Sequence, residues 1–202
     1  TWEPVDPVRH LTNPSSGKMG YALAKVAKRK GAQVTLVSGP TSLSPPYGVK
    51  VVRVQTAKQM HQAVLEEFPQ MDAVAMAAAV SDYRPRKTAS AKIKKTGDIN
   101  GLELERTEDI LSRLGEQKKG RVLVGFAAET ENLLENAKEK LHQKNLDFIV
   151  ANDLTAANAG FGSDTNEVTV LWQDGRMETI ALADKEEVAR EIWDRVEGLW
   201  RQ

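Results

Sequence analysis

Short apolar segments alternate with helix-like segments along most of this chain, and that alternation restricts the fold more than any other feature. The segment 72–80 is apolar throughout, so we expect a central strand covered on both faces. Strands that alternate with helices form parallel sheets with right-handed crossovers. The sequence therefore predicts a Rossmann-like, three-layer α/β domain with a mostly parallel sheet. Its expected strands are 33–37, 49–54, 72–80, 121–126 and 147–151, with a short alternating strand at 102–105.

Polar residues that can cap a helix precede most of the helical patterns. We expect a helix from the end of a glycine-bearing loop to Lys30, and residues 1–10 to be irregular because Pro4 and Pro7 oppose a helix. The other helices are predicted to start at side-chain caps, two of them with a capping-box partner three residues on. These caps are Thr56 with Gln59, Thr107, Thr130, and Asp184 with Glu187.

The C-terminal part of the sequence has a different pattern. Two alternating segments, 168–172 and 177–180, flank an Asp174-Gly175 pair, which is typical of a β-hairpin. We expect this hairpin to extend one edge of the sheet. No linker, repeat or low-complexity segment divides the sequence, so residues 1–202 are interpreted as a single domain.

Composition excludes several kinds of chemistry. Lys plus Arg equal Asp plus Glu at 28 each, so bulk charge supports neither a nucleic-acid partner nor a membrane surface. The absence of cysteine excludes disulfides, thiol catalysis and thiolate metal sites, and is consistent with a cytoplasmic protein. The three histidines are scattered, no apolar run reaches membrane-spanning length, and the polar N-terminal residues do not form a signal peptide.

A polar loop, 12–20, leads directly into the first helix. Ser15, Ser16, Gly17 and Gly20 at a helix start leave main-chain N–H groups approachable by an anion, and Asn13 adds an amide that can donate and accept. An ordinary helix cap with a tight turn explains the loop about equally well. We expect the loop to lie at the carboxyl edge of the sheet, where open α/β sheets bind ligands.

Three segments follow strands and should reach the same edge, namely 81–95 after the strand 72–80, 125–130 after Val124, and 151–153 after Val150. Asp82 is a candidate Mg²⁺ ligand, directly or through water, although a turn aspartate is an equally good reading. Lys92, Lys94 and Lys95 lie in a segment that could close over a triphosphate, although a solvated charge run is the more ordinary reading.

Small residues and a lysine pair complete the candidates. Phe126 and the two alanines after it could let a flat base lie against the backbone, or could simply pack tightly. Lys140 and Lys144 share one helix face and could reach a phosphate, although surface pairs with Glu135 and Glu139 are more ordinary. No acid–base dyad, triad or thiol nucleophile stands out. Chemistry that depends on positioning and charge neutralisation, such as nucleotidyl or phosphoryl transfer, fits this profile.

Six motifs occur in an order that resembles phosphopantothenoylcysteine synthetase, the synthetase domain of the bacterial bifunctional coenzyme A biosynthesis protein. The resemblance covers nearly the whole chain and extends to a further motif at 160–166, before the hairpin. The six motifs are Glu3-Pro4-Val5-Asp6-Pro7-Val8-Arg9, Asn13-Pro14-Ser15-Ser16-Gly17-Lys18-Met19-Gly20, Ala78-Ala79-Val80-Ser81-Asp82-Tyr83, Lys92-Ile93-Lys94-Lys95, Gly125-Phe126-Ala127-Ala128-Glu129-Thr130 and Ala151-Asn152-Asp153.

The resemblance implies a ligase that joins 4′-phosphopantothenate to L-cysteine with CTP as co-substrate, through an acyl-cytidylate, releasing CMP and pyrophosphate. It implies that Asn13 and Lys92 are catalytic and that Asp82 and Mg²⁺ lie near the phosphates. The resemblance further implies nucleotide contacts for four residues, Ala78, Phe126, Lys140 and Lys144. It implies contacts with the phosphopantothenate for Arg9, Asn13 and Ala79.

The resemblance also concerns what surrounds the domain. The family is dimeric, so a homodimer is expected, and a flavin-dependent decarboxylase domain often precedes it. We expect no flavin chemistry from this chain alone. The family usually has a strand and a glycine-rich turn just before the position of Thr1, and this central first strand is absent from the sequence.

Two other functions remain open from the residues. A dinucleotide-dependent oxidoreductase could have the same fold, but no G-x-G-x-x-G opens a helix here. A nucleotide-binding or dimerisation module without turnover would bind CTP and release no pyrophosphate. Pyrophosphate release therefore separates the ligase from this module.

Overall fold

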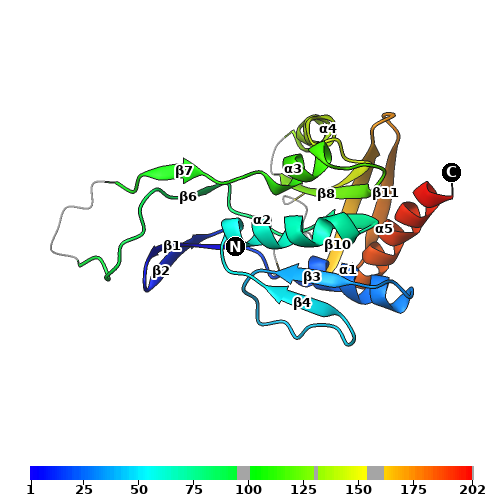
Figure 1. The fold of residues 1–202 in the computed structure, drawn as a ribbon. Coiled ribbons are helices and arrows are strands. Elements are labelled where there is room, and N and C mark those ends of the chain that lie inside the picture. Colours follow the sequence, from blue (N-terminus) through cyan, green and yellow to red (C-terminus); the bar gives the residue numbers. More distant parts are fainter. Residues whose placement is uncertain (95–100, 130–131, 154–161, 202) are drawn as a thin grey trace.

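A computed structural model describes residues 1–94, 101–129, 132–153 and 162–201, and its centre is a five-stranded sheet (Figure 1). The three strands β5, β8 and β9 are parallel, and the hairpin β10–β11 continues the sheet in antiparallel fashion beside β9. The predicted parallel sheet and the edge hairpin are therefore confirmed. The strands are β5 (Ala73–Met76), β8 (Val122–Glu129), β9 (Phe148–Asp153), β10 (Thr165–Trp172) and β11 (Met177–Asp184).

Helices cover both faces of this sheet. Along β8, Val122 and Val124 pack in one core cluster with α1 and α5, whereas Leu123 packs in a second cluster with α2, α3 and α4. This alternation follows from the two-residue period of a strand. The predicted three-layer α/β architecture is confirmed. The helices are α1 (Lys18–Arg29), α2 (Ala57–Glu67, extended by the short 3-10 helix η1, Phe68–Gln70), α3 (Ile110–Glu116), α4 (Leu133–Gln143) and α5 (Lys185–Trp200).

A separate parallel pair, β3 (Thr35–Ser38) and β4 (Lys50–Arg53), lies beside α1. Among the described residues β3 pairs only with β4, and β5 pairs only with β8. The prediction that the segment 72–80 forms a central strand is therefore wrong for the sheet as described, since β5 is its last strand. Its residues are only half-buried, because none of the strands in the described part of the chain pairs with its second edge.

Two hairpins project together from the body, to the left in Figure 1. They are β1 (Trp2–Asp6) with β2 (Arg9–Thr12), and β6 (Tyr83–Pro85) with β7 (Leu104–Arg106). The expectation that residues 1–10 are irregular is wrong, because proline is tolerated in an exposed edge strand and Pro7 lies in the turn. Ala89 N donates to Val5 O at 3.0 Å and links the two hairpins.

The residues that cap the helices can be compared with the predicted caps. Thr56 and Gln59 form the expected capping box of α2, and Asp184 caps α5 by accepting from the amides of Glu186 and Glu187. The predicted cap Thr107 is wrong, because Asp109 accepts from Ser112 N and starts α3 two residues later. Thr130 lies outside the described residues, and α4 begins after Asn132.

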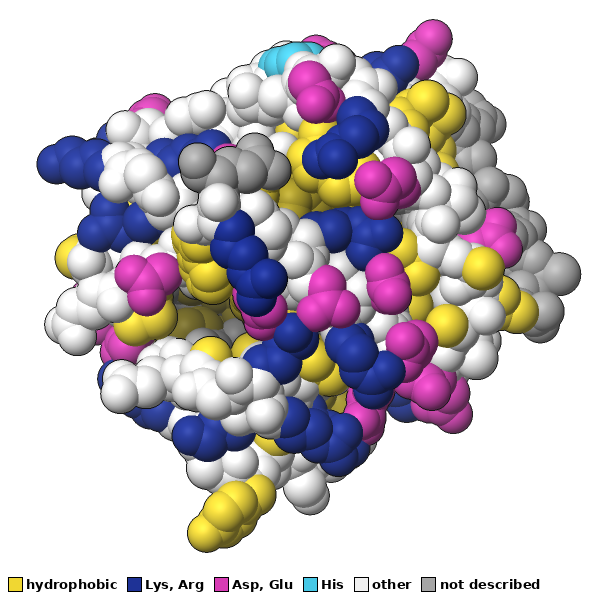
Figure 2. All heavy atoms as spheres, turned by 90° about the vertical axis from the view of Figure 1, so that its right-hand side faces the viewer, with side chains coloured by type: hydrophobic (Ala, Val, Ile, Leu, Met, Phe, Trp, Pro, Cys, Tyr) yellow, Lys and Arg dark blue, Asp and Glu magenta, His cyan; other side chains and the backbone are white. Residues whose placement is uncertain are grey.

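Charged side chains of both signs are interspersed over the face shown in Figure 2. Between α1 and α5, Lys30 pairs with Asp194 at 2.7 Å and with Glu197 at 2.8 Å, and Arg29 pairs with Glu186 at 2.6 Å. This pattern agrees with the formal net charge of zero. In the described part of the chain, no helix is both long enough and apolar enough to cross a membrane.

Candidate functional site

The loop that precedes α1 and the turn that follows β5 meet at the carboxyl edge of the sheet. Asn13 Nδ2 donates to Val80 O at 3.4 Å, and the main-chain nitrogen of Thr1 donates to Ala79 O at 3.0 Å. Ser81 N in turn donates to Thr1 Oγ1 at 3.1 Å. The structure thus brings Asn13, Ala79 and their neighbours together, as the positions of their segments after strands predict.

The start of α1 leaves main-chain donors open. Gly17 has a φ of +76°, a left-handed conformation that favours glycine, and no side chain caps the helix. Ser15 and Ser16 accept from the amides of Gly17 and Lys18 only at 3.4 Å. A helix start with such long contacts can still accept an anion, because its N–H groups carry the positive end of the helix dipole.

Asp82 lies in the same turn with an exposed carboxylate. Its main-chain oxygen accepts from Thr107 N at 2.9 Å, and Thr107 Oγ1 donates to Ser81 O at 2.6 Å. These bonds fix the turn to the segment that enters α3. The described residues contain no group of three or more His, Asp or Glu side chains arranged for a metal ion. One carboxylate suits Mg²⁺, which is often held by one or two carboxylates together with substrate phosphates.

Lys92 is exposed, and the residue after it is anchored to the first hairpin. Ile93 N donates to Asp6 Oδ2 at 3.1 Å, and the Arg9 guanidinium donates to Ile93 O at 3.0 Å. Arg9 also pairs with the buried Asp6, and its hydrogen bond holds the pKa of Asp6 well below the ordinary value. The structure therefore places Arg9 beside Lys92, whereas Lys95 lies outside the described residues.

Ala78 follows the end of β5, and Phe126 lies within the neighbouring strand β8. Met76 and Gly125 are register partners in the β5–β8 pair, so Ala78 and Phe126 follow at nearly the same height. Ala78 is exposed and Phe126 is half-buried. The expected strand 121–126 is confirmed and continues to Glu129 in β8, and Phe126 pairs with Val150 of β9, so Phe126 lies inside the strand rather than in a segment after it.

Lys144 closes the C-terminal end of α4 and pairs with Asp109. The two charged atoms, Nζ and Oδ2, are 2.9 Å apart. Burial alone would raise the pKa of Asp109, but the hydrogen bonds from Ser112 N and Lys144 outweigh it and the pKa is lowered. Lys140 is half-buried on the same helix. The Lys144 ammonium thus reaches the start of α3 at Asp109, and Asp109 is two residues beyond the Thr107 that holds the Asp82 turn.

Comparison with known proteins identifies the family. The model of the family described as DNA/pantothenate metabolism flavoprotein C-terminal domain matches residues 1–199. This chain belongs to that family. The "Coenzyme A biosynthesis bifunctional protein CoaBC" of Bacillus subtilis is 48% identical over 203 residues, which cover 100% of this chain and 50% of that protein. The protein of the same name from Escherichia coli is 44% identical over 200 residues, covering 97% of this chain and 49% of its own length.

Solved structures of the family agree with the fold. The C-terminal domain of a CoaBC protein has a TM-score of 0.84 at 46% identity, covering 100% of this chain and 91% of that one. A DNA/pantothenate metabolism flavoprotein from Streptococcus pneumoniae has a TM-score of 0.83 at 23% identity, covering 98% and 95% of the two chains, and supports the fold alone. The family predicted from the six motifs is thereby confirmed. The chain spans about half the length of the curated relatives it matches.

Sequence reasoning missed residues that hold this family's candidate site in place. Asp6 anchors Ile93, Thr1 bridges two segments, and Asp109 pairs with Lys144. Glu3 is 1% exposed and accepts from Ala57 N, the first amide of α2, at 2.8 Å. Glu3 and Asp6 are three positions apart in a segment that contains Pro4 and Pro7, so no two-residue alternation in the sequence signalled two buried carboxylates.

Proposed function

We propose that this domain is a ligase that joins 4′-phosphopantothenate to L-cysteine with CTP, in coenzyme A biosynthesis. Membership of the family and the names of its relatives support the pathway. The observation that carries the proposal is the hydrogen bonding that gathers Asn13, the Ala78–Asp82 turn and the entry to α3 at one edge. Residues from separate motifs thereby surround a place where a nucleotide and an acid can meet.

In the proposed first step the substrate carboxylate attacks the α-phosphorus of CTP. A carboxylate oxygen forms the new bond, the bond to the β-phosphate oxygen breaks, and pyrophosphate leaves from an acyl-cytidylate. This step increases negative charge on the leaving phosphates, so fixed positive groups accelerate it. The exposed ammonium of Lys92 is the proposed source of that charge, carried by a segment anchored at Ile93.

Asp82 is the proposed holder of Mg²⁺, directly or through water, together with the nucleotide phosphates. When bound, the ion supplies positive charge that screens the phosphates and orients them. Asp82 itself is positioned by its main-chain bond to Thr107 N, so its carboxylate faces solvent while its backbone is fixed. The start of α1 and its open N–H groups offer a further anion contact at the same edge.

In the proposed second step the amine of L-cysteine attacks the activated carbonyl. A carbon–nitrogen bond forms, the bond to the cytidylate oxygen breaks, CMP leaves, and the amine loses a proton. Asn13 is proposed to orient the acyl-cytidylate, since its amide can donate and accept. Its single long contact to Val80 O leaves the side chain able to turn toward a ligand.

Base and substrate contacts follow from the same placement. Ala78 and Phe126 are proposed to read the cytosine through main-chain groups, and Lys140 with Lys144 to contact the nucleotide from α4. Lys144 would release Asp109 and bind a phosphate instead. A phosphate can reach this ion pair because the Asp109 side chain is about half exposed. Arg9 and Ala79 are proposed to lie on the phosphopantothenate side, where Arg9 adjoins the Lys92 segment.

The direct test is product formation with each of the common nucleoside triphosphates. The domain is mixed with 4′-phosphopantothenate, L-cysteine and Mg²⁺, and the amide product is measured by mass spectrometry. The proposal predicts product with CTP and strongly reduced product with the other triphosphates. Product formed equally well with ATP would contradict the CTP assignment, and CTP binding without product would favour the binding module.

The proposal extends to the surroundings of the domain. We propose that this domain is one of two fused units, because its relatives are named bifunctional and the chain matches half of each. We also propose a cytoplasmic homodimer, as the resemblance of the six motifs implies. The other unit is proposed to be the flavin-dependent decarboxylase, so this domain needs no flavin. Light scattering on the purified domain tests the dimer.

A further inference from the structure

Lys18 is the first residue of α1, and its side chain faces away from the candidate site. Asn13 and Ala79 line one cavity, whereas Lys18 lines a separate groove between α1 and the start of α5. There the Lys18 ammonium donates to Gly162 O and to Asp164 Oδ1, both at 2.7 Å. These acceptors directly precede β10, so the contact ties the start of α1 to a distant part of the chain.

The first turn of α5 holds the same short segment from its other side. Lys185 Nζ donates to Ser163 O, and Lys185 N donates to Asp164 O at 3.1 Å. Ser163 Oγ accepts from the main-chain nitrogen of Thr165, the first residue of β10, at 3.2 Å. The segment is therefore fixed by α5 and by the sheet, and Lys18 attaches α1 to it. We name this arrangement the clasp; it consists of Lys18, Gly162, Ser163, Asp164 and Lys185.

The charges in the clasp favour the ion pair between Lys18 and Asp164. The hydrogen bond from Lys18 lowers the pKa of Asp164. Burial lowers the pKa of Lys185, and the nearby Lys18 ammonium lowers it further. The Asp164 side chain is 86% exposed, however, and an exposed ion pair contributes little to the free energy of unfolding. Stability of the fold therefore does not account for the clasp.

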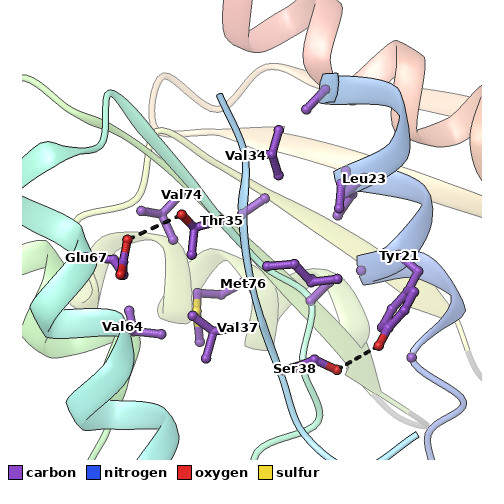
Figure 3. A pocket seen from close by; sticks show the side chains of 18 of the residues that line it. Tyr21, Leu23, Val34, Thr35, Val37, Ser38, Val64, Glu67, Val74 and Met76 are labelled. Atoms are coloured by element: carbon purple, nitrogen blue, oxygen red, sulfur yellow. Dashed lines mark hydrogen bonds between the residues drawn. The ribbon is translucent and has the colours of Figure 1, made fainter. Parts of the chain in front are cut away.

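Other contacts hold the body of α1 in place. Tyr21 Oη and Ser38 Oγ of β3 are hydrogen-bonded at 3.1 Å, and Figure 3 shows the two side chains pointing toward each other. Trp193 Nε1 of α5 donates to Leu23 O at 2.9 Å, and Leu23 packs in one core cluster with further residues of α5. Loss of the Lys18 side chain should therefore leave the helix in place and affect only its first turn.

The loop before α1 is held by longer side-chain contacts than those of the clasp. The hydrogen bonds of Asn13 Nδ2, Ser15 Oγ and Ser16 Oγ are all 3.4 Å long. Thr41 Oγ1, between β3 and β4, donates to Ser16 O at 3.1 Å. Among the side-chain hydrogen bonds of this loop and the helix start in the described part of the chain, the two from Lys18 are the shortest. Lys18 therefore has the firmest hold on the position of the helix start.

We infer that Lys18 is a positioning residue, which bonds Gly162 O and Asp164 and so holds the Asn13 loop and the open N–H groups of α1 where the substrates meet them. Its effect on turnover rests on the proposed function, whereas its hold on the helix start can be measured without substrate. A misplacement of about 1 Å can reduce a rate by about a hundredfold, so a contact remote from the substrates can control the reaction.

Lys18→Met and Asp164→Ala open the clasp from its two sides. We expect each to lower kcat by about tenfold or more while the KM for CTP changes by less than about threefold. Lys18→Arg should retain most of the activity, since a guanidinium can donate to both acceptors. The double variant should be no slower than Lys18→Met alone, because both changes break the same contact. A raised KM in Lys18→Met together with normal turnover in Asp164→Ala would overturn the inference, since Lys18 would then bind the nucleotide itself.

Lys25→Met is the matched control for the ion pair. Lys25 also joins α1 to α5, through Glu186, and its side chain is about as exposed as that of Lys18. This variant should leave kcat unchanged. Amide hydrogen exchange at Tyr21 N, which donates to Gly17 O at 3.1 Å, reports on the helix start without substrate. We expect this exchange to be about fivefold or more faster in Lys18→Met than in Lys25→Met, because loss of the clasp favours local opening.

The exchange measurement separates failure of this inference from failure of the proposed function. Equal exchange at Tyr21 N in the two variants would overturn the clasp, whatever the ligase assay shows. Faster exchange in Lys18→Met with an unchanged kcat would contradict the positioning role and leave the ligase intact. A lack of product in the unaltered chain would contradict the proposed function, and exchange would still decide whether the clasp holds the helix start.

Discussion

Single side chains at buried junctions connect the hairpins to the candidate site. Asp6 is 2% exposed and receives hydrogen bonds from Val8 N, Arg9 and Ile93 N. Each bond favours the ionised carboxylate, so the folded protein holds this group charged where the unfolded chain would begin to take up a proton. The position of the Lys92 segment therefore depends on the charge of one buried residue.

Asp6→Asn tests that dependence through pH. The pKa of Asp6 is lowered from an ordinary 3.8, so its stabilising contribution is complete above the unfolded value and declines as the pH falls toward the folded one. We expect the Tm difference between the original protein and Asp6→Asn to be constant from pH 7 to about 5 and to narrow below about 4. Melting curves followed by circular dichroism measure it. A difference that widens on acidification would contradict this account.

Lys92→Gln tests the proposed catalytic charge. The side chain is exposed, so its loss should leave the Tm unchanged, whereas pyrophosphate release should fall by about a hundredfold or more. Lys87→Gln is the matched control, because Lys87 is an exposed lysine in the same segment between β6 and β7 as Lys92. Rates are measured with a coupled pyrophosphate assay. Equal rates in the two variants would remove Lys92 from the mechanism.

Elements are positioned by close backbone approaches as well as by side chains. A Cβ on Gly115 in α3 would lie 2.1 Å from Lys144 O, and Asn145 Nδ2 donates to Gly115 O at 3.1 Å. The C-terminal ends of α3 and α4 therefore meet backbone to backbone. This contact keeps Lys144 within reach of Asp109 at the other end of the short helix α3.

Gly115→Ala should destabilise the protein, because the carbonyl that it meets is main chain and must shift with α4. Overpacking of this kind costs about 1–3 kcal/mol, which lowers the Tm of a domain of this size by several degrees. The control is Gly198→Ala in α5, where a Cβ would meet nothing within 4 Å and helix propensity improves by up to about 1 kcal/mol. Calorimetry of both variants measures the contrast, and a Tm for Gly115→Ala at or above that of Gly198→Ala would be inconsistent with it.

The elements predictable from sequence were those with a local physical signal. Thr56 with Gln59 forms a capping box from four consecutive residues, and Asp174-Gly175 forms a turn in which Gly175 has a φ of +86°. The strands β1 and β6 lack such a signal, because Pro4 and Pro85 weaken the strand pattern while the partner strand supplies the pairing, whereas β7 overlaps the alternating segment 102–105. Asp109 caps α3 because it directly precedes the first helical residue and accepts from Ser112 N, whereas Thr107 lies outside the helix and donates to Ser81 O across the fold.

At the scale of the whole molecule, the order of strands and helices was predictable, whereas many contacts that build the site were not. The alternation along the chain determines which ends of strands share an edge, and this brought Asn13, Asp82 and Phe126 to one side. The pairing of Lys144 with Asp109, rather than with Glu135 or Glu139, depends on packing of α3 against α4. The position of β5 as the last strand of the described sheet also could not be predicted, because it depends on which strands pair in three dimensions.

The central claim is that this edge activates a carboxylate by nucleotidyl transfer before the amine attacks. Pyrophosphate release from CTP, 4′-phosphopantothenate and Mg²⁺ is measured first without and then with L-cysteine. The account predicts release of about one equivalent per site without cysteine, and continuous turnover when cysteine is added. Release that requires cysteine from the first turnover, or none with any triphosphate in a protein that binds CTP, would contradict it.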